Sequence, residues 1–69
     1  MNKHGVETGK IKFFNRDKGF GFIKNDNESE IFFHITECHD YLPKQEDRVE
    51  FTIGEGKKGE MAKNVTPTY

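Results

Sequence analysis

Two short segments of this 69-residue chain alternate as β-strands do, and each carries apolar side chains on both faces. In segment 18–23, KGFGFI, side chains two positions apart point to the same face of a strand. Phe20 and Phe22 therefore share one face, while Gly21 and Ile23 share the other. A sheet requires only one apolar face to build a core, so this strand has more apolar surface than packing requires.

Segment 31–35, IFFHI, repeats the arrangement. Alternation puts Phe32 and His34 on one face, and the remaining two isoleucines and phenylalanine on the other. Each segment thus has a face with aliphatic side chains for the core and a second face of flat rings. The second set of rings has no obvious internal partner in so short a chain. Flat rings among positive charges are what unstacked nucleic-acid bases require.

Strand patterns recur along the chain, separated by turn-rich segments. They cover residues 8–15, 19–24, 30–35, 47–54 and 60–66. The fourth alternates most clearly, with Val49, Phe51 and Ile53 predicted to point inward. Segment 37–47 is the only other long stretch, and Pro43 interrupts it, so we expect a connecting loop with room for one helical turn. Five short strands favour a small barrel, because closure removes exposed sheet edges.

Composition limits the chain to one small domain, predicted to span residues 1–69 with its core at about 8–66. Hydrophobic residues make up 32% and charged residues 33%. The predicted core is Ile11, Ile23, Ile31, Phe33, Val49, Phe51, Ile53 and Val65. We find no membrane-spanning run or signal peptide and expect a cytoplasmic protein. Cys38 is the only cysteine, which precludes an intramolecular disulfide and agrees with a reducing compartment.

The distribution of charge matters more here than its sum. The net charge is -1, which argues mildly against a nucleic-acid-binding domain. Segment 10–24, however, holds five lysine or arginine residues and one acid, while other acidic residues gather elsewhere in the chain. We therefore expect a local positive track beside the rings.

Taken together, these segments resemble the bacterial cold-shock domain. Segment 9–15, GKIKFFN, is similar to the first strand of that family, and segments 18–23 and 31–35 are similar to its two ribonucleoprotein motifs. Segments 49–51 and 64–65 resemble its fourth and fifth strands. The resemblance implies an all-β fold, a five-stranded antiparallel barrel of the oligonucleotide-binding (OB) type. It also implies binding of single-stranded RNA or DNA with little sequence preference, as an RNA chaperone, without catalysis or a cofactor.

The resemblance also implies which residues form the site. The expected base-stacking residues are Phe13, Phe14, Phe20, Phe22, Phe32 and His34. The expected phosphate-binding residues are Lys12, Lys18 and Lys58, and Asp26 is placed in a loop near the edge of the stacking surface. The chain departs from the family at Phe13, where tryptophan is usual, and at Ile35, where phenylalanine is usual; both changes reduce the stacking surface.

Two points remain open from the sequence. Strict alternation sends either Phe13 or Phe14 inward, unless a β-bulge presents both. The exposed rings could also be the interface of a protein-interaction barrel or a homodimer instead of a surface for nucleic acid. We favour a monomer that binds nucleic acid. We expect no metal site, because His34, Cys38 and His39 match no zinc-binding spacing.

Overall fold

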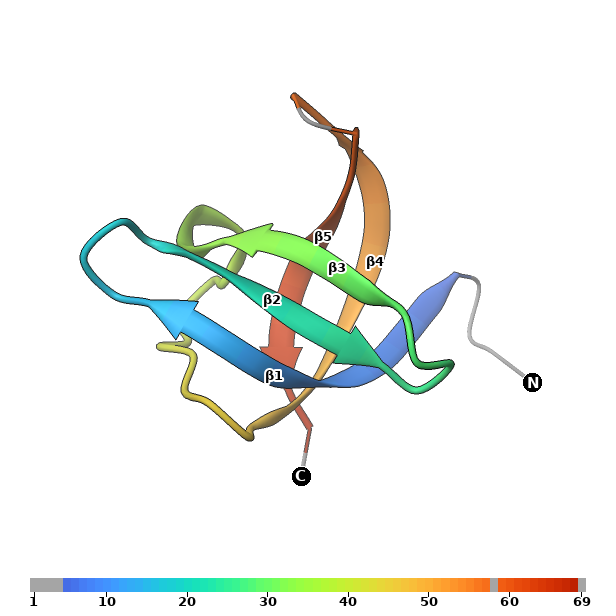
Figure 1. The fold of residues 1–69 in the computed structure, drawn as a ribbon, viewed down its shortest axis with the longest axis horizontal. Coiled ribbons are helices and arrows are strands. Elements are labelled where there is room, and N and C mark those ends of the chain that lie inside the picture. Colours follow the sequence, from blue (N-terminus) through green and yellow to red (C-terminus); the bar gives the residue numbers. More distant parts are fainter. Residues whose placement is uncertain (1–4, 58, 69) are drawn as a thin grey trace.

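Five β-strands close into a barrel in the structure, a computed structural model that describes residues 5–57 and 59–68 (Figure 1). The strands are β1 (Val6–Asn15), β2 (Phe20–Asn25), β3 (Glu30–His34), β4 (Arg48–Gly56) and β5 (Gly59–Pro67). A single 3₁₀ turn, η1 (Ile35–Glu37), follows β3. Around the barrel the order is β1-β2-β3-β5-β4. The predicted all-β OB barrel is confirmed.

The long first strand holds the barrel together, because it belongs to both halves. It pairs antiparallel with β2 from Gly9 to Asn15 and with β4 from Val6 to Lys10. Pairing is antiparallel between β2 and β3 and between β4 and β5, whereas β3 meets β5 in parallel, at Phe32 and Met61. The family resemblance implied an antiparallel barrel, and every strand contact except β3–β5 is antiparallel. A closed ring with an odd number of strands cannot alternate in direction at every contact, so one contact is parallel.

The core lies on the inner faces of the strands and agrees with the predicted set except at Ile53. The buried hydrophobic residues are Ile11, Ile23, Ile31, Phe33, Cys38, Val49, Phe51, Ala62 and Val65. Ile53 is 40% exposed, so its predicted place in the core is wrong. It keeps the alternation of β4, because the register shift between Glu50 and Thr52 puts the extra residue on β5. Beyond this irregularity the β4–β5 hairpin projects past the other strands (Figure 1), where no core is left to cover it.

Gly21 allows β1 and β2 to lie close together beneath the phenylalanines. A Cβ atom there would lie 2.2 Å from the carbonyl oxygen of Phe13 and 2.8 Å from the ring of Phe33. Both distances are far below van der Waals contact. The core side of β2 must therefore be bare at this position, while the residues on either side, Phe20 and Phe22, point outward.

The segment between η1 and β4 is a loop, as predicted, and it closes one end of the barrel. Pro43 is buried, and Tyr41 packs against the core while its hydroxyl donates a hydrogen bond to Asp47. Burial, with the nearby Glu37 carboxylate, raises the pKa of Cys38 to about 11. Cys38 is thus a protonated core thiol at neutral pH. Within residues 5–57 and 59–68, no helix has the length and apolar character that crossing a membrane requires.

Candidate nucleic-acid interface

Four phenylalanine rings form a continuous surface on the outside of β1, β2 and β3. We call Phe13, Phe20, Phe22 and Phe32 the aromatic platform. Phe20 is at its centre, with ring centroids 6.2 Å from Phe13, 6.3 Å from Phe22 and 5.9 Å from Phe32. Phe22 and Phe32 are 6.0 Å apart. Each distance lies in the range for favourable aromatic pairs. Phe13 is 44% exposed and the other three are half-buried.

Strand register brings these rings together from three separate segments. Phe22 is opposite Phe32, and Phe20 is opposite His34, in the β2–β3 pairing. On β1, the register shifts between Ile11 and Phe13, and this bulge sets Phe13 opposite Phe22. The alternation in each segment was visible in the sequence, but the neighbours of each ring follow from the register.

The bulge on β1 does not present both of its phenylalanines. It leaves Lys12 and Phe13 exposed in succession, whereas Phe14 is half-buried. The Phe14 ring stacks on Phe33, with centroids 5.8 Å apart and planes 15° apart, and it packs against the core. Phe14 is therefore the one phenylalanine among the predicted stacking residues that is not part of the platform.

His34 continues the outer face of β3 beyond Phe32, and its ring is held by the following turn. The backbone N–H of Thr36 donates to His34 Nδ1 at 3.2 Å, and the Thr36 hydroxyl oxygen lies 3.0 Å from the same nitrogen. An Nδ1 that accepts a hydrogen bond places the proton of the neutral imidazole on Nε2. His34 is thus oriented and offers Nε2–H as a hydrogen-bond donor.

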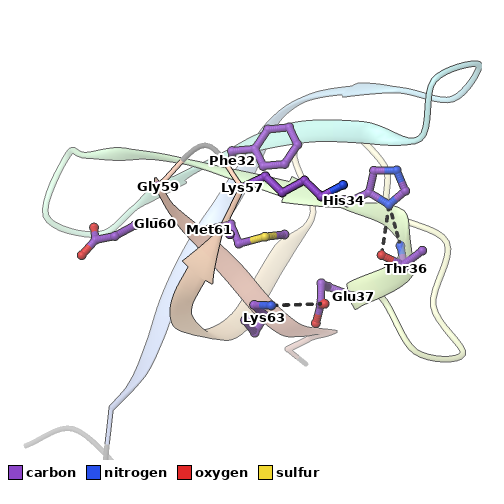
Figure 2. Close-up of a pocket in the computed structure, with 10 residues that line it drawn as sticks. Phe32, His34, Thr36, Glu37, Lys57, Gly59, Glu60, Met61 and Lys63 are labelled. Atoms are coloured by element: carbon purple, nitrogen blue, oxygen red, sulfur yellow. Dashed lines mark hydrogen bonds and ion pairs between the residues drawn. The ribbon is translucent and has the colours of Figure 1, made fainter.

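A groove of about 510 Å³ adjoins the platform between β3 and the β4–β5 hairpin (Figure 2). Phe32 and His34 line one side, and Lys57 and Met61 line the other. The floor contains Glu37, whose carboxylate is 3.8 Å from the ammonium of Lys63 and accepts the backbone N–H of Asn64 at 3.2 Å. Sequence reasoning missed Met61 and Lys63, because only the parallel β3–β5 contact brings β5 beside β3 and places both residues in the groove. Lys58, predicted to bind phosphate, lies outside the described residues.

Several of the predicted cations already have an acidic partner. The ammonium group of Lys12 forms an ion pair with Glu30, and Lys24 lies 3.1 Å from Glu28. By contrast Lys18, also predicted to bind phosphate, is exposed and makes no ion pair within the described ranges. The predicted positive track is therefore neutralised in part by residues of the protein itself.

Asp26 links three segments of the barrel. The Arg48 guanidinium donates to both of its carboxylate oxygens, at 3.1 Å each, and the Thr8 hydroxyl donates to one of them. The hydrogen bonds from Arg48 and then Thr8 hold the pKa of Asp26 below its usual range. The acceptor atoms of Asp26 are thus engaged within the barrel. Among the residues described, no group of three or more histidine, cysteine or acidic side chains is placed to hold a metal ion.

Comparison with known proteins identifies the family of this chain. A sequence model of the family described as 'Cold-shock' DNA-binding domain matches residues 7–68. The major cold shock protein CspA of Bacillus cereus is 43% identical over 61 residues, which are 84% of this chain and 91% of the relative. Cold shock protein CspD of Bacillus subtilis is 41% identical over 63 residues, 87% of this chain and 96% of the relative. Cold shock-like protein CspG of Escherichia coli is 44% identical over 62 residues, 84% and 89% of the two chains. The chain belongs to the cold-shock domain family, whose members bind nucleic acid and are not enzymes.

Proposed function

We propose that this protein binds single-stranded RNA or DNA with little sequence preference and acts as an RNA chaperone. One observation carries the proposal: the barrel fills its core from the inner faces of its strands and still groups four phenylalanines on an outer face. An exposed apolar patch of this kind marks a binding surface. Bases that stack on the platform would each contribute about 1–3 kcal/mol.

The chemistry of the surface accounts for both the strand preference and the sequence tolerance. Every base has a flat π face, so stacking on Phe20, Phe22 or Phe32 discriminates weakly between bases. In a duplex those faces are covered by neighbouring base pairs, so only unpaired strands can stack. His34 Nε2–H adds one hydrogen-bond donor at the end of the row, and Lys18 and Lys57 are exposed cations beside it. By binding unpaired strands, the protein shifts marginal hairpins toward the open state through mass action, without nucleotide hydrolysis.

In this proposed function, residues 1–69 form one cold-shock domain with its core at about 8–66, and the protein acts as a cytoplasmic monomer. Bases stack on five side chains: Phe13, Phe20, Phe22, Phe32 and His34. Lys18 and Lys58 meet phosphates, and Lys12 does so after it leaves Glu30. Phe14 and Asp26 are assigned to the support of this surface, because their contacts lie within the barrel.

A titration with two ligands of equal length tests the proposal. Oligothymidine should bind, and a duplex of the same length should bind far more weakly, while sedimentation of the free protein should give the mass of a monomer. Affinity for the single strand should fall with salt, at a log–log slope of about -0.7 for each phosphate neutralised. A dimer in which the titration finds no binding to either ligand would instead identify the platform as a protein interface.

A further inference from the structure

A hollow adjoins one end of the aromatic platform. Four lysine or arginine residues line this hollow, and each of them has an acidic partner. The pairs are Lys10–Glu46 at 3.4 Å, Lys12–Glu30, Lys24–Glu28 at 3.1 Å and Arg48–Asp26 at 3.1 Å. The hollow of about 410 Å³ is lined by all four cations and by three of their partners. Because each positive charge is matched by a negative one, the four pairs carry no net charge.

The opposite end of the platform is different. Arg16 and Lys18 lie in the turn between β1 and β2, with Asp17 between them. All three are exposed and form no ion pair within residues 5–57 and 59–68, so this turn keeps a net positive charge. Along β2, Phe20, Phe22 and Lys24 occupy alternate positions and therefore share the outer face. A nucleic-acid strand that follows this face runs from cations without a partner, across the rings, to cations that are already paired.

Glu30 is the acidic member of these pairs that lies on β3, the strand of Phe32. It lies two positions before Phe32 on β3 and, with Phe22 and Phe32, lines a hollow of about 400 Å³. Its hydrogen bond and charge interaction with Lys12 hold the pKa of Glu30 below its usual range, so it is ionised at neutral pH. Ion pairs this exposed are weak, and a phosphate can displace the carboxylate. The displaced carboxylate nevertheless stays on its strand beside the rings and repels the phosphate.

We propose that Glu30 competes with nucleic-acid phosphate for Lys12, and so limits both the affinity of the protein and the length of strand that it engages. Glu28 acts in the same way on Lys24. This inference rests on the proposed function. It predicts that tight contact is confined to the platform and the Arg16–Lys18 end, with little electrostatic gain when the strand is extended over the paired end.

The decisive variant is Glu30→Gln, which removes the charge and keeps the shape. We expect it to bind a single-stranded oligothymidine about 3- to 5-fold more tightly than the wild-type protein in dilute buffer, the size of one unit charge acting over a few ångströms in water. Its log–log salt dependence should be steeper by about 0.7, one more phosphate neutralised. The difference should disappear near 1 M salt, where screening acts within about 3 Å.

Strand length provides a second measurement. With oligothymidines of about 4 to 12 nucleotides, the affinity of the wild-type protein should level off at a shorter length than that of Glu30→Gln, because only the variant gains from phosphates over the paired end. Circular dichroism verifies that the variant is folded. If it is not, Glu28→Gln tests the same competition at Lys24, with the same expected direction.

Glu50→Gln is the matched control, because it changes the net charge equally. Glu50 lies on β4, pairs in register with Thr66 and Thr8, and forms no ion pair in the described part of the chain. Its affinity should equal that of the wild-type protein. The inference would be overturned by an equal gain in affinity in Glu50→Gln, or by an unchanged affinity and salt slope in folded Glu30→Gln. In either case, single-strand binding by the wild-type protein would still support the proposed function. Failure of every form to bind oligothymidine would refute the proposed function itself.

Discussion

Adjacent phenylalanines on β3 should respond to truncation in opposite ways. Phe33 is fully buried at the centre of the barrel, whereas Phe32 is half-buried on the outer face and contacts Phe20 and Phe22. Replacing each with alanine removes the same atoms from the same strand, one position apart. The pair therefore separates the role of a ring in folding from its role in binding.

The two costs follow from these environments. Phe33→Ala leaves a cavity in the core and should cost about 3–5 kcal/mol of unfolding free energy. A 69-residue domain has only about 3–10 kcal/mol in total, so this variant should be largely unfolded or close to it. Phe32→Ala loses two aromatic contacts on the surface and should cost about 1–2 kcal/mol. It should remain folded and lose about 1–3 kcal/mol in binding to a single strand.

Urea unfolding followed by circular dichroism measures the first quantity, and titration with oligothymidine under folding conditions measures the second. If Phe32→Ala destabilises the protein as much as Phe33→Ala does, the Phe32 ring belongs to the core. A folded Phe32→Ala with wild-type affinity would mean that the platform is not the binding surface. Either result would contradict the division of the barrel into an inner and an outer aromatic face.

Three further predictions concern positions elsewhere in the barrel. Gly21→Ala should lower the free energy of unfolding by about 1–3 kcal/mol or more, because the new Cβ atom would meet backbone and core atoms. In the same urea experiment Gly54→Ala should have little effect, because its Cβ atom would meet only a flexible lysine side chain. Arg48 lowers the pKa of Asp26 in the folded protein below the ordinary value of 3.8. The ionised Asp26 therefore stabilises the fold at a pH above its unfolded pKa, and this stabilisation is lost as the pH falls through the folded pKa. Acid titration of Asp26→Asn should lack that loss; an acid transition identical to wild type would contradict the assignment. Phe13→Trp introduces the only indole of the chain, and its fluorescence should be quenched by oligothymidine and unchanged by a duplex. The affinity for oligothymidine should become tighter by a few tenths to about 1 kcal/mol. An indole whose fluorescence responds to neither ligand would mean that Phe13 lies away from the bound strand.

The sequence predicted what depends on local alternation. The five strands, the inward aliphatic residues and the outward Phe20, Phe22 and Phe32 all follow from side chains that repeat every second position. Phe14 lies where that period is broken, because a bulge precedes it on β1. Ile53 is missed for another reason: β4 keeps its alternation, since the extra residue of the β4–β5 register shift is on β5, but Ile53 lies where the hairpin projects past the core. A bulge changes the face of every later residue in the strand, and its position is set by the pairing of two strands rather than by either strand alone.

The partners of charged residues were also beyond local reasoning. Segment 10–24 is rich in lysine and arginine, yet Lys12 pairs with Glu30, which is 18 positions away and reaches it across β2. Composition counts charges along the chain, whereas the potential at a surface depends on charges that are near in space. A cationic segment therefore predicts a positive surface only where its strand neighbours are not acidic.

Closure of the barrel and formation of the groove beside the platform have a common origin. Five strands in a ring require one parallel contact, and here it falls between β3 and β5, where Phe32 and Met61 are the single pair in register. The antiparallel contacts of the other strands extend over five or more register pairs, so β3 and β5 are the least tightly joined neighbours. Where they diverge, the groove opens between Phe32 and the projecting β4–β5 hairpin (Figure 2). Phe32 takes part in the parallel β3–β5 contact and also belongs to the aromatic platform. The groove that opens beside this contact therefore adjoins the platform.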